Sequence, residues 1–122
     1  MKKANVIEEK SFEFAVRMVK TYQYLADTKR EFVLSKQLLR SGTSIGANVS
    51  EASGAISKAD FSSKISIAYK ECLETKYWLK LLGRTEFIDK KGDESLYADA
   101  DEIGRILFSI LKTTRINKHN GQ

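Results

Sequence analysis

Residues 61 to 82 carry a heptad pattern that restricts this chain to a packed helical fold. The pattern consists of seven residues at alternating spacings of four and three: Phe61, Ile65, Ala68, Cys72, Thr75, Leu79 and Leu82. Such spacing places every member on one stripe of an α-helix, as in helical bundles and coiled coils. Ser57, with Asp60 three residues later, resembles a capping box and predicts a helix over roughly 58–83.

Apolar periodicity predicts three further helices, over roughly 7–26, 31–54 and 94–117. Their stripes are Phe14, Ala15, Met18, Tyr22 and Leu25 in the first, Leu34, Leu38, Ile45, Val49 and Ala52 in the second, and Leu96, Ala100, Ile103, Leu107, Ile110 and Thr114 in the last. The chain contains no proline to interrupt them. The segment GRTEFIDKKGDES, with a glycine toward each end and several charges, predicts the longest loop.

The length of 122 residues and the 42% hydrophobic composition suit one domain with one core, over residues 1–122. Four helices, three of them joined by short connections, favour an all-α, antiparallel up-down-up-down four-helix bundle. The single cysteine cannot form an internal disulfide, no apolar run is long enough to span a membrane, and the start MKKANVIEEK lacks the apolar stretch of a signal peptide. We therefore expect a soluble, cytoplasmic protein.

The stretch RSGTSIGANVSEASGA, residues 40–55, is nearly stripped of bulky side chains. Eleven of the fifteen residues from Ser41 to Ala55 are Gly, Ala, Ser or Thr. The stretch has no lysine, which a phosphate-binding loop requires, and it keeps ordered helical faces. One face repeats small residues every four positions: Gly42, Gly46, Ser50 and Gly54. Because each glycine costs a helix about 1 kcal/mol relative to alanine, Gly42 and Gly46 predict close approach of a neighbouring helix, from this chain or another subunit.

A polar network is predicted between the second and third helices. It would join Arg40, Ser44 and Asn48 to the carboxylates Glu71 and Glu74, which lie one turn apart. Paired carboxylates can also serve acid–base catalysis or hold a metal, but bundle metal sites use Glu-x-x-His motifs.

The only histidine, His119, lies in a polar tail, and Cys72 lies on the core seam, which favours a buried apolar residue over a nucleophile. We predict no enzymatic activity, no metal and no cofactor.

Basic residues gather in the first forty positions, which hold nine Lys or Arg against five acids in a chain of net charge +5. The candidate nucleic-acid-binding set is Lys10, Arg17, Lys20, Tyr24, Lys29, Arg30 and Lys36. Such surfaces bind phosphate backbones through counterion release, although most charge runs are simply solvated faces. The acidic block Asp93, Glu94, Asp99, Asp101 and Glu102 is interpreted as complementing the dipole at the start of the last helix.

Several large apolar residues remain outside the predicted core stripes: Leu39, Ile67, Trp78 and Phe108. Large aromatic residues outside a core often mark an interface. We therefore expect self-association, which would also repeat any basic surface and strengthen its field.

Three segments resemble a known family: KSFEFAVRMVKTYQYL, EFVLSKQLLRSGTSIGANVSEASGA and SKADFSSKISIAYKECLETKYWLKLL, together most of residues 10–82. They are similar to the bacterial four-helix-bundle proteins first noted as open reading frames in intervening sequences of 23S rRNA genes, with LLRSGTSIGANVSEA as the most specific string. They also resemble the accessory variability determinant of diversity-generating retroelements. The resemblance implies an antiparallel bundle that forms a homopentameric ring, and a basic barrel that binds nucleic acid and a reverse transcriptase.

The family motif falls on Arg40, Ser41, Ser44, Ile45, Asn48, Glu51, Glu71 and Glu74. The resemblance implies that these residues form a polar spine between the second and third helices, with no enzymatic role. Two functions follow as expectations. The first is a non-enzymatic homo-oligomer that binds RNA or DNA backbone, and the alternative is a scaffold that recruits a partner protein without nucleic acid.

Overall fold

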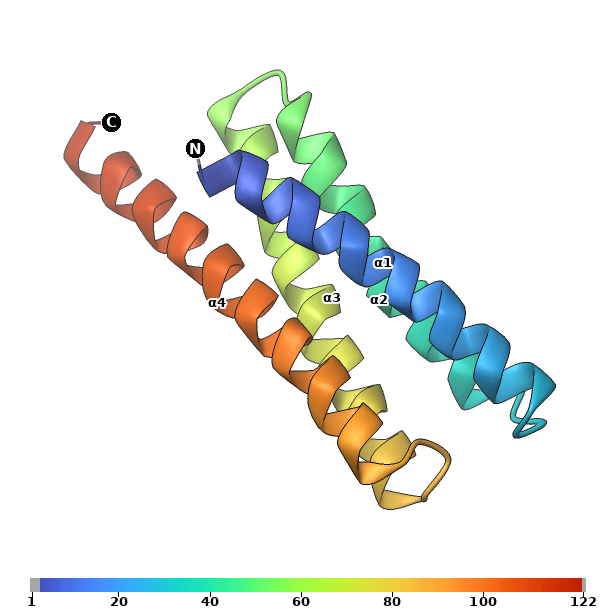
Figure 1. Ribbon diagram of the computed structural model, residues 1–122. Helices are drawn as coiled ribbons and strands as arrows, with labels where there is room; N and C mark the ends of the chain where they lie inside the picture. The colour runs from blue at the N-terminus through green and yellow to red at the C-terminus, as the bar shows by residue number, and fades with distance from the viewer. Residues whose placement is uncertain (1–2, 122) are drawn as a thin grey trace.

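The computed structural model describes the backbone of residues 3–121 and the side chains of residues 6–114. It consists of four antiparallel helices, shown in Figure 1: α1 (Lys3–Asp27), α2 (Leu34–Ser53), α3 (Lys58–Arg84) and α4 (Lys90–Gly121). The predicted all-α, up-down-up-down four-helix bundle is confirmed. Within the described residues, no helix is long and apolar enough to cross a membrane.

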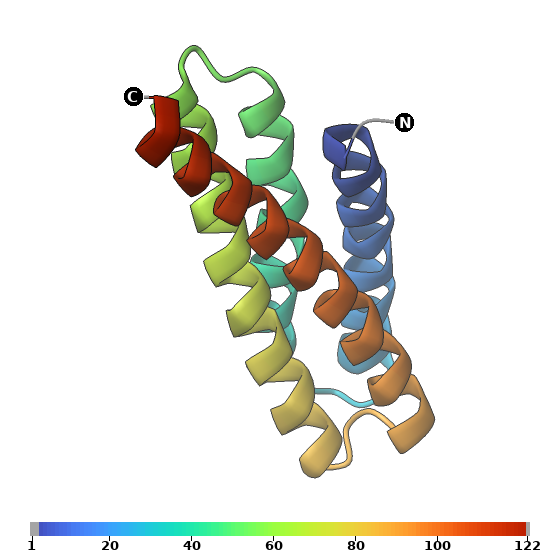
Figure 2. The same ribbon diagram turned by 90° about the vertical axis from the view of Figure 1, so that its left-hand side faces the viewer.

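The four helices do not pack equally on one another. α2 packs extensively on both α1 and α3, and α3 packs on α4, whereas α1 touches α4 only sparsely. Figure 2 shows α4 inclined to α1, close to it at one end of the bundle and diverging from it toward the chain termini. The close end, which we term the double-turn end, carries both the α1–α2 turn (28–33) and the α3–α4 turn (85–89).

The predicted stripes form the core. Every residue of the predicted α3 stripe from Ile65 to Leu82 is buried, and Phe61 packs at the edge of the core. On α4 the stripe from Leu96 to Ile110 is buried as well. Of the α1 stripe, Phe14, Met18 and Leu25 are buried and Ala15 and Tyr22 are half-buried. The 3.6-residue period therefore predicted most of the interior, but not Ile7, Ser11 and Leu111, which are also buried.

Side-chain caps determine where two helices begin. Ser57 Oγ accepts a hydrogen bond from the Asp60 backbone N–H at 3.0 Å, which confirms the predicted cap of α3. α2 begins at Leu34 and not at the predicted residue 31. The Glu31 carboxylate accepts the backbone N–H groups of Val33, Leu34 and Ser35, at 3.2, 3.0 and 2.7 Å. Because this carboxylate occupies the helix start, Glu31 itself lies outside the helix.

The prediction of the longest loop at 83–95 is wrong. Only residues 85–89 separate α3 from α4, and the longest connection is 28–33. Asp89 Oδ1 accepts the Gly92 backbone N–H at 2.7 Å, so α4 begins four residues before the predicted position 94. Gly83 lies within α3, and Asp93 packs directly against it, in space that a Cβ atom at Gly83 would fill.

Candidate nucleic-acid interface

The bare face of α2 packs against α1 of the same chain. A Cβ atom at Gly42 would overlap the Met18 side chain, and one at Gly46 would stand 3.1 Å from the Ser11 carbonyl oxygen. The close contact involves only these two glycines. Ser50 is exposed, and Gly54 lies just beyond the helix with only the Glu51 carbonyl near it. The predicted four-residue surface is therefore half as long as expected.

Arg40 joins α2 to two carboxylates of α3. Its Nη1 lies 3.2 Å from Glu71 Oε1, its Nη2 contacts Glu74, and Trp78 Nε1 donates to Glu74 at 2.9 Å. These hydrogen bonds, from Trp78 first and then Arg40, hold the pKa of Glu74 below its usual value, and the bond to Glu74 raises the pKa of Arg40. The Arg40 side chain is still 48% exposed, so this cluster of Arg40, Glu71 and Glu74, which we term the Arg40 clasp, lies at the surface.

The other residues of the polar spine divide into those that reach α3 and those that do not. Ser41 is buried with its Oγ 3.0 Å from Thr75 Oγ1, and Glu51 pairs with Lys64 at 3.0 Å. Ile45 lies in the hydrophobic core. Asn48 donates to the Ser44 carbonyl of its own helix at 2.8 Å, so the structure does not link Asn48 to the carboxylates of α3. The prediction that Ser44 and Asn48 share the Arg40 network is wrong.

The Cys72 thiol is buried in the core, as the sequence predicted. Its Sγ donates to the Ala100 carbonyl at 3.1 Å, and burial raises the pKa of the thiol to about 11. A thiol in this environment is a poor nucleophile at neutral pH. His119 lies outside the described side chains.

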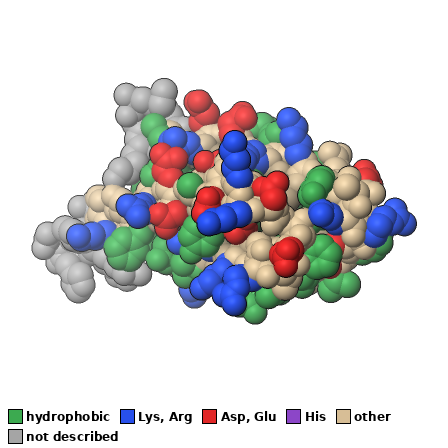
Figure 3. All heavy atoms as spheres, turned by 60° about the horizontal axis from the view of Figure 1, so that its bottom comes forward, with side chains coloured by type: hydrophobic (Ala, Val, Ile, Leu, Met, Phe, Trp, Pro, Cys, Tyr) green, Lys and Arg blue, Asp and Glu red, His purple; other side chains and the backbone are tan. Residues whose placement is uncertain are grey.

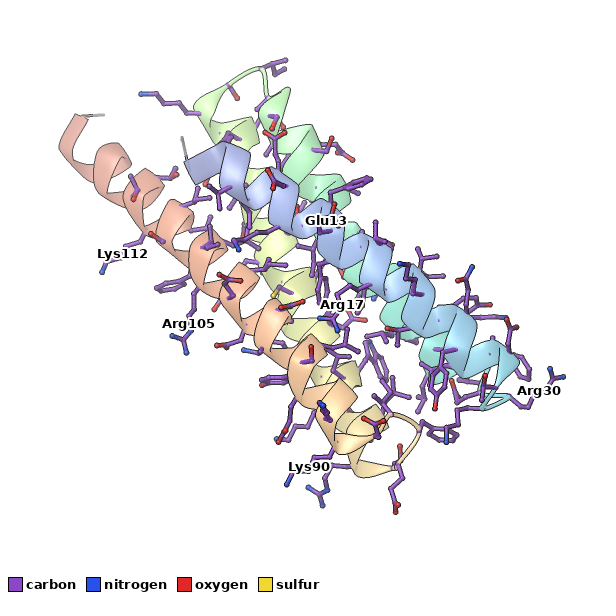
Figure 4. All side chains as sticks on the ribbon, in the orientation of Figure 1. Glu13, Arg17, Arg30, Lys90, Arg105 and Lys112 are labelled. Atoms are coloured by element: carbon purple, nitrogen blue, oxygen red, sulfur yellow. The ribbon has the colours of Figure 1, made fainter. Side chains whose placement is uncertain are left out.

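Two of the predicted nucleic-acid contacts are engaged by acids of α4. Lys10 pairs with Glu102 at 3.3 Å, and Arg17 contacts Asp99 and also donates to Ser95 Oγ at 3.1 Å. Figure 4 shows Arg17 on the side of α1 that faces α4. The side between α1 and α4 is therefore not a free basic surface.

Three of the five acids in the acidic block pair with basic side chains and lie too far along α4 to act on its dipole. Asp99 and Glu102 bind α1, and Asp101 binds Lys76 of α3 at 2.8 Å and Arg105 at 2.9 Å. All three acids lie more than two turns beyond the start of α4, where the dipole has little effect. The interpretation from sequence holds for Asp93, which lies in the first turn of α4, and is corrected to ion pairing for Asp99, Asp101 and Glu102.

Eight cations at or near the double-turn end form no ion pair with any described acid. These turn-end cations are Lys20, Lys29, Arg30, Lys36, Lys80, Arg84, Lys90 and Lys91. Arg30 lies over the Phe32 ring, 5.1 Å from its centroid. Figure 4 shows Arg30 and Lys90 pointing away from the bundle, and Figure 3, with this end turned forward, shows Lys and Arg interspersed with Asp and Glu.

Sequence reasoning found only half of this set. Lys80, Arg84, Lys90 and Lys91 are distant in sequence from the basic first segment and were not predicted. An up-down-up-down topology places the first and third turns at the same end, and this was the signal that could have found them. Tyr24, also predicted, is 43% exposed and lies beside Lys20 on α1.

Two apolar patches lie on the surface of the bundle, one on α3 and α4 and the other on α1 and α2. The α3–α4 patch consists of Tyr69, Leu73, Tyr77 and Phe108. The centroids of the Tyr69 and Phe108 rings are 5.8 Å apart. The α1–α2 patch consists of Phe12 and Val19, with a shallow groove that Gly46 and Ser50 help to line.

Phe12 is 66% and Tyr77 59% exposed, so both patches present large side chains to solvent. Of the predicted apolar surplus, Phe108 and Ile67 are exposed, while Leu39 and Trp78 are half-buried.

These features define a helical-bundle protein with an ion-paired flank, an end where eight cations without a described ion pair lie among acids, and two exposed apolar patches. The chain belongs to the 23S rRNA-intervening sequence protein family, whose model matches residues 3–109.

The fold is also that of a protein of unknown function from the S23 ribosomal protein family of Bacteroides thetaiotaomicron VPI-5482. The two are 55% identical, with 91% of this chain and 99% of that chain covered and a TM-score of 0.90. No curated protein matches the chain.

Proposed function

We propose that this protein is a non-enzymatic, self-assembling module, a homopentameric ring, that binds nucleic-acid backbone through its turn-end cations. The observation that carries the proposal is the convergence of eight cations without described ion-pair partners from all four helices on one end of the bundle. Lys and Arg side chains that are free of carboxylates can exchange solution counterions for phosphates. The family to which the chain belongs is described by an rRNA context, which is consistent with this partner class.

Ring assembly is supported by the positions of the two apolar patches. Because they lie on different faces, a contact between the α3–α4 patch of one copy and the α1–α2 patch of the next is heterologous, and repetition of such a contact can close a ring. Copies related by a ring axis would present their double-turn ends repeatedly. A modest charge on one protomer then becomes a strong, salt-sensitive field.

A gel-shift series with a structured RNA at increasing salt tests the binding proposal. We expect affinity to fall steeply with salt. A variant carrying Lys29→Glu and Arg30→Glu should bind more weakly, and its salt dependence should be shallower by about one slope unit for each phosphate that it no longer neutralises. A control variant carrying Lys58→Glu and Lys112→Glu makes the same charge change at exposed positions away from the double-turn end and should bind more tightly than the turn variant. Absence of binding at low salt would refute the proposal.

A protein-recruiting scaffold is the second candidate, and the exposure of Leu73, Tyr77 and Phe108 favours it. Aromatic residues are enriched in protein interfaces. This alternative predicts that a partner is captured from nuclease-treated lysate by wild-type protein and by the turn variant alike, and that Tyr77→Glu abolishes capture. A partner that disappears after nuclease treatment would instead point to nucleic acid as the bridge.

A further inference from the structure

A cleft separates the second half of α1 from the start of α4, next to the double-turn end. Its volume is about 320 Å³. It is lined by Arg17, Lys20, Thr21 and Tyr24 of α1 and by Ile88, Asp89, Gly92 and Leu96 of the α3–α4 turn and α4. This size lies at the lower end of the range for small-ligand pockets, about 300–1,000 Å³, and suits one ring system rather than an extended ligand.

The cleft has an apolar floor and a polar rim. Ile88 and Leu96 are buried, whereas Tyr24 and Lys20 are exposed at the rim. A tyrosine ring can stack on any nucleobase, and a neighbouring ammonium group can hold the attached phosphate.

The two charged residues Asp89 and Arg17, which line the cleft, are held in ways that disfavour a phosphate. Asp89 accepts the Gly92 backbone N–H and so places a carboxylate at the start of α4, where an anion would otherwise bind. The Arg17 guanidinium is held by Asp99. The floor of the cleft thus offers apolar surface, the exposed Asp89 carboxylate offers an acceptor on its wall, and Lys20, which has no described ion pair, stands at its edge.

We infer that this cleft takes an unpaired nucleobase of a single-stranded nucleic acid, stacked on Tyr24, with the sugar–phosphate backbone on Lys20. The positions of the charges determine how the nucleotide is oriented in the cleft. The Asp89 carboxylate repels the phosphate and accepts hydrogen bonds from the N–H groups of a base edge. A base inside a duplex has both faces stacked and its pairing edge occupied, so it cannot enter. The inference rests on the proposed function and specifies it further: single strands bind more tightly than duplexes.

The test compares a short single-stranded RNA that carries one 2-aminopurine with the same RNA annealed to its complement, at fixed low salt. We expect wild-type protein to prefer the single strand and to quench the 2-aminopurine fluorescence. Tyr24→Ala should weaken single-strand binding roughly 5- to 150-fold, the equivalent of about 1–3 kcal/mol per stacked base, and should remove the quenching while duplex binding stays unchanged. Tyr24→Phe keeps the ring and should behave as wild type.

The results separate the cleft from the proposed function. If Tyr24→Ala binds the single strand as tightly as wild type while the Lys29→Glu and Arg30→Glu variant loses binding, the cleft inference is overturned and the backbone proposal stands. If neither RNA binds wild-type protein at low salt, both are overturned. Tyr24→Leu, which keeps apolar volume at this half-exposed position, replaces Tyr24→Ala if the latter lowers the melting temperature.

Discussion

Gly46 of α2 lies so close to Ser11 of α1 that a Cβ atom at Gly46 would stand 3.1 Å from the Ser11 carbonyl oxygen. The obstacle is backbone, which cannot rotate aside as a side chain can. Gly46→Leu therefore has to push α1 away from α2, and overpacking of this kind typically costs about 1–3 kcal/mol. We expect the free energy of unfolding, measured by urea denaturation, to fall by that amount.

The adjacent Ala47→Leu is the matched control for this substitution. Ala47 is exposed on the outer face of α2, so the same added side chain meets solvent and should change stability by no more than about 0.5 kcal/mol. Equal stability of the two leucine variants would show that α1 and α2 do not depend on the missing side chain.

The Arg40 clasp is expected to be a modest stabiliser. Arg40, Glu71 and Glu74 are all partly exposed, and exposed ion pairs contribute about 0.2–1 kcal/mol. A double-mutant cycle of Arg40→Ala and Glu74→Ala should give a coupling energy in that range. Arg40→Lys should recover little of it, because the two carboxylates contact different guanidinium nitrogens. Additive single substitutions would mean that the clasp contributes nothing.

Asp93 makes the folded state sensitive to pH. Its Oδ1 is buried without a hydrogen-bond partner among the described residues, and burial, followed by the nearby Glu94 charge, raises the pKa of this carboxyl. The folded protein therefore binds the Asp93 proton more tightly than the unfolded chain does. This contribution to stability is complete below the unfolded pKa and is lost as the pH rises through the folded pKa.

Asp93→Asn removes the charge without changing the shape of the side chain. We expect the variant to melt at a higher temperature than wild type at neutral pH and to lose that advantage at acidic pH. Melting curves from about pH 3 to about pH 8 measure the difference. A constant difference across this range would rule out the ionisation of Asp93 as its cause.

Tyr77 should be required for assembly but not for folding. Placing a charge in the α3–α4 patch opposes burial of this patch against another copy. We expect Tyr77→Glu to give smaller particles by light scattering with an unchanged helical circular dichroism spectrum. Ile56→Glu, at a 94% exposed position on the α2–α3 turn, should assemble as wild type. Persistence of the wild-type mass in Tyr77→Glu would exclude this patch as an interface.

The sequence predicted features that depend on neighbours within one or two turns. The α3 stripe and the Ser57 cap are local, so periodicity and spacing were sufficient. The Lys10–Glu102 and Arg17–Asp99 pairs join helices at opposite ends of the chain, and no local pattern specifies which acid meets which base. The excess of basic residues therefore predicted a free surface, although part of it is neutralised.

The error at the α3–α4 turn has a similar cause. Gly83 has the character of a helix breaker, but its missing side chain makes room for Asp93 of the next helix. The same ambiguity applied to Gly42 and Gly46, whose neighbour could be assigned to α1 only in three dimensions. A glycine in a helix indicates close approach, and only the fold shows which element approaches.

Gel filtration coupled to light scattering, with absorbance at 260 and 280 nm recorded on the same peak, tests most directly whether this protein assembles and carries nucleic acid. We expect a mass several times that of the 13.8 kDa protomer, with nucleic acid that travels with the protein at low salt and leaves it at high salt. A 13.8 kDa particle with a protein-only absorbance ratio, at low salt and with RNA added, would contradict both the assembly and the binding.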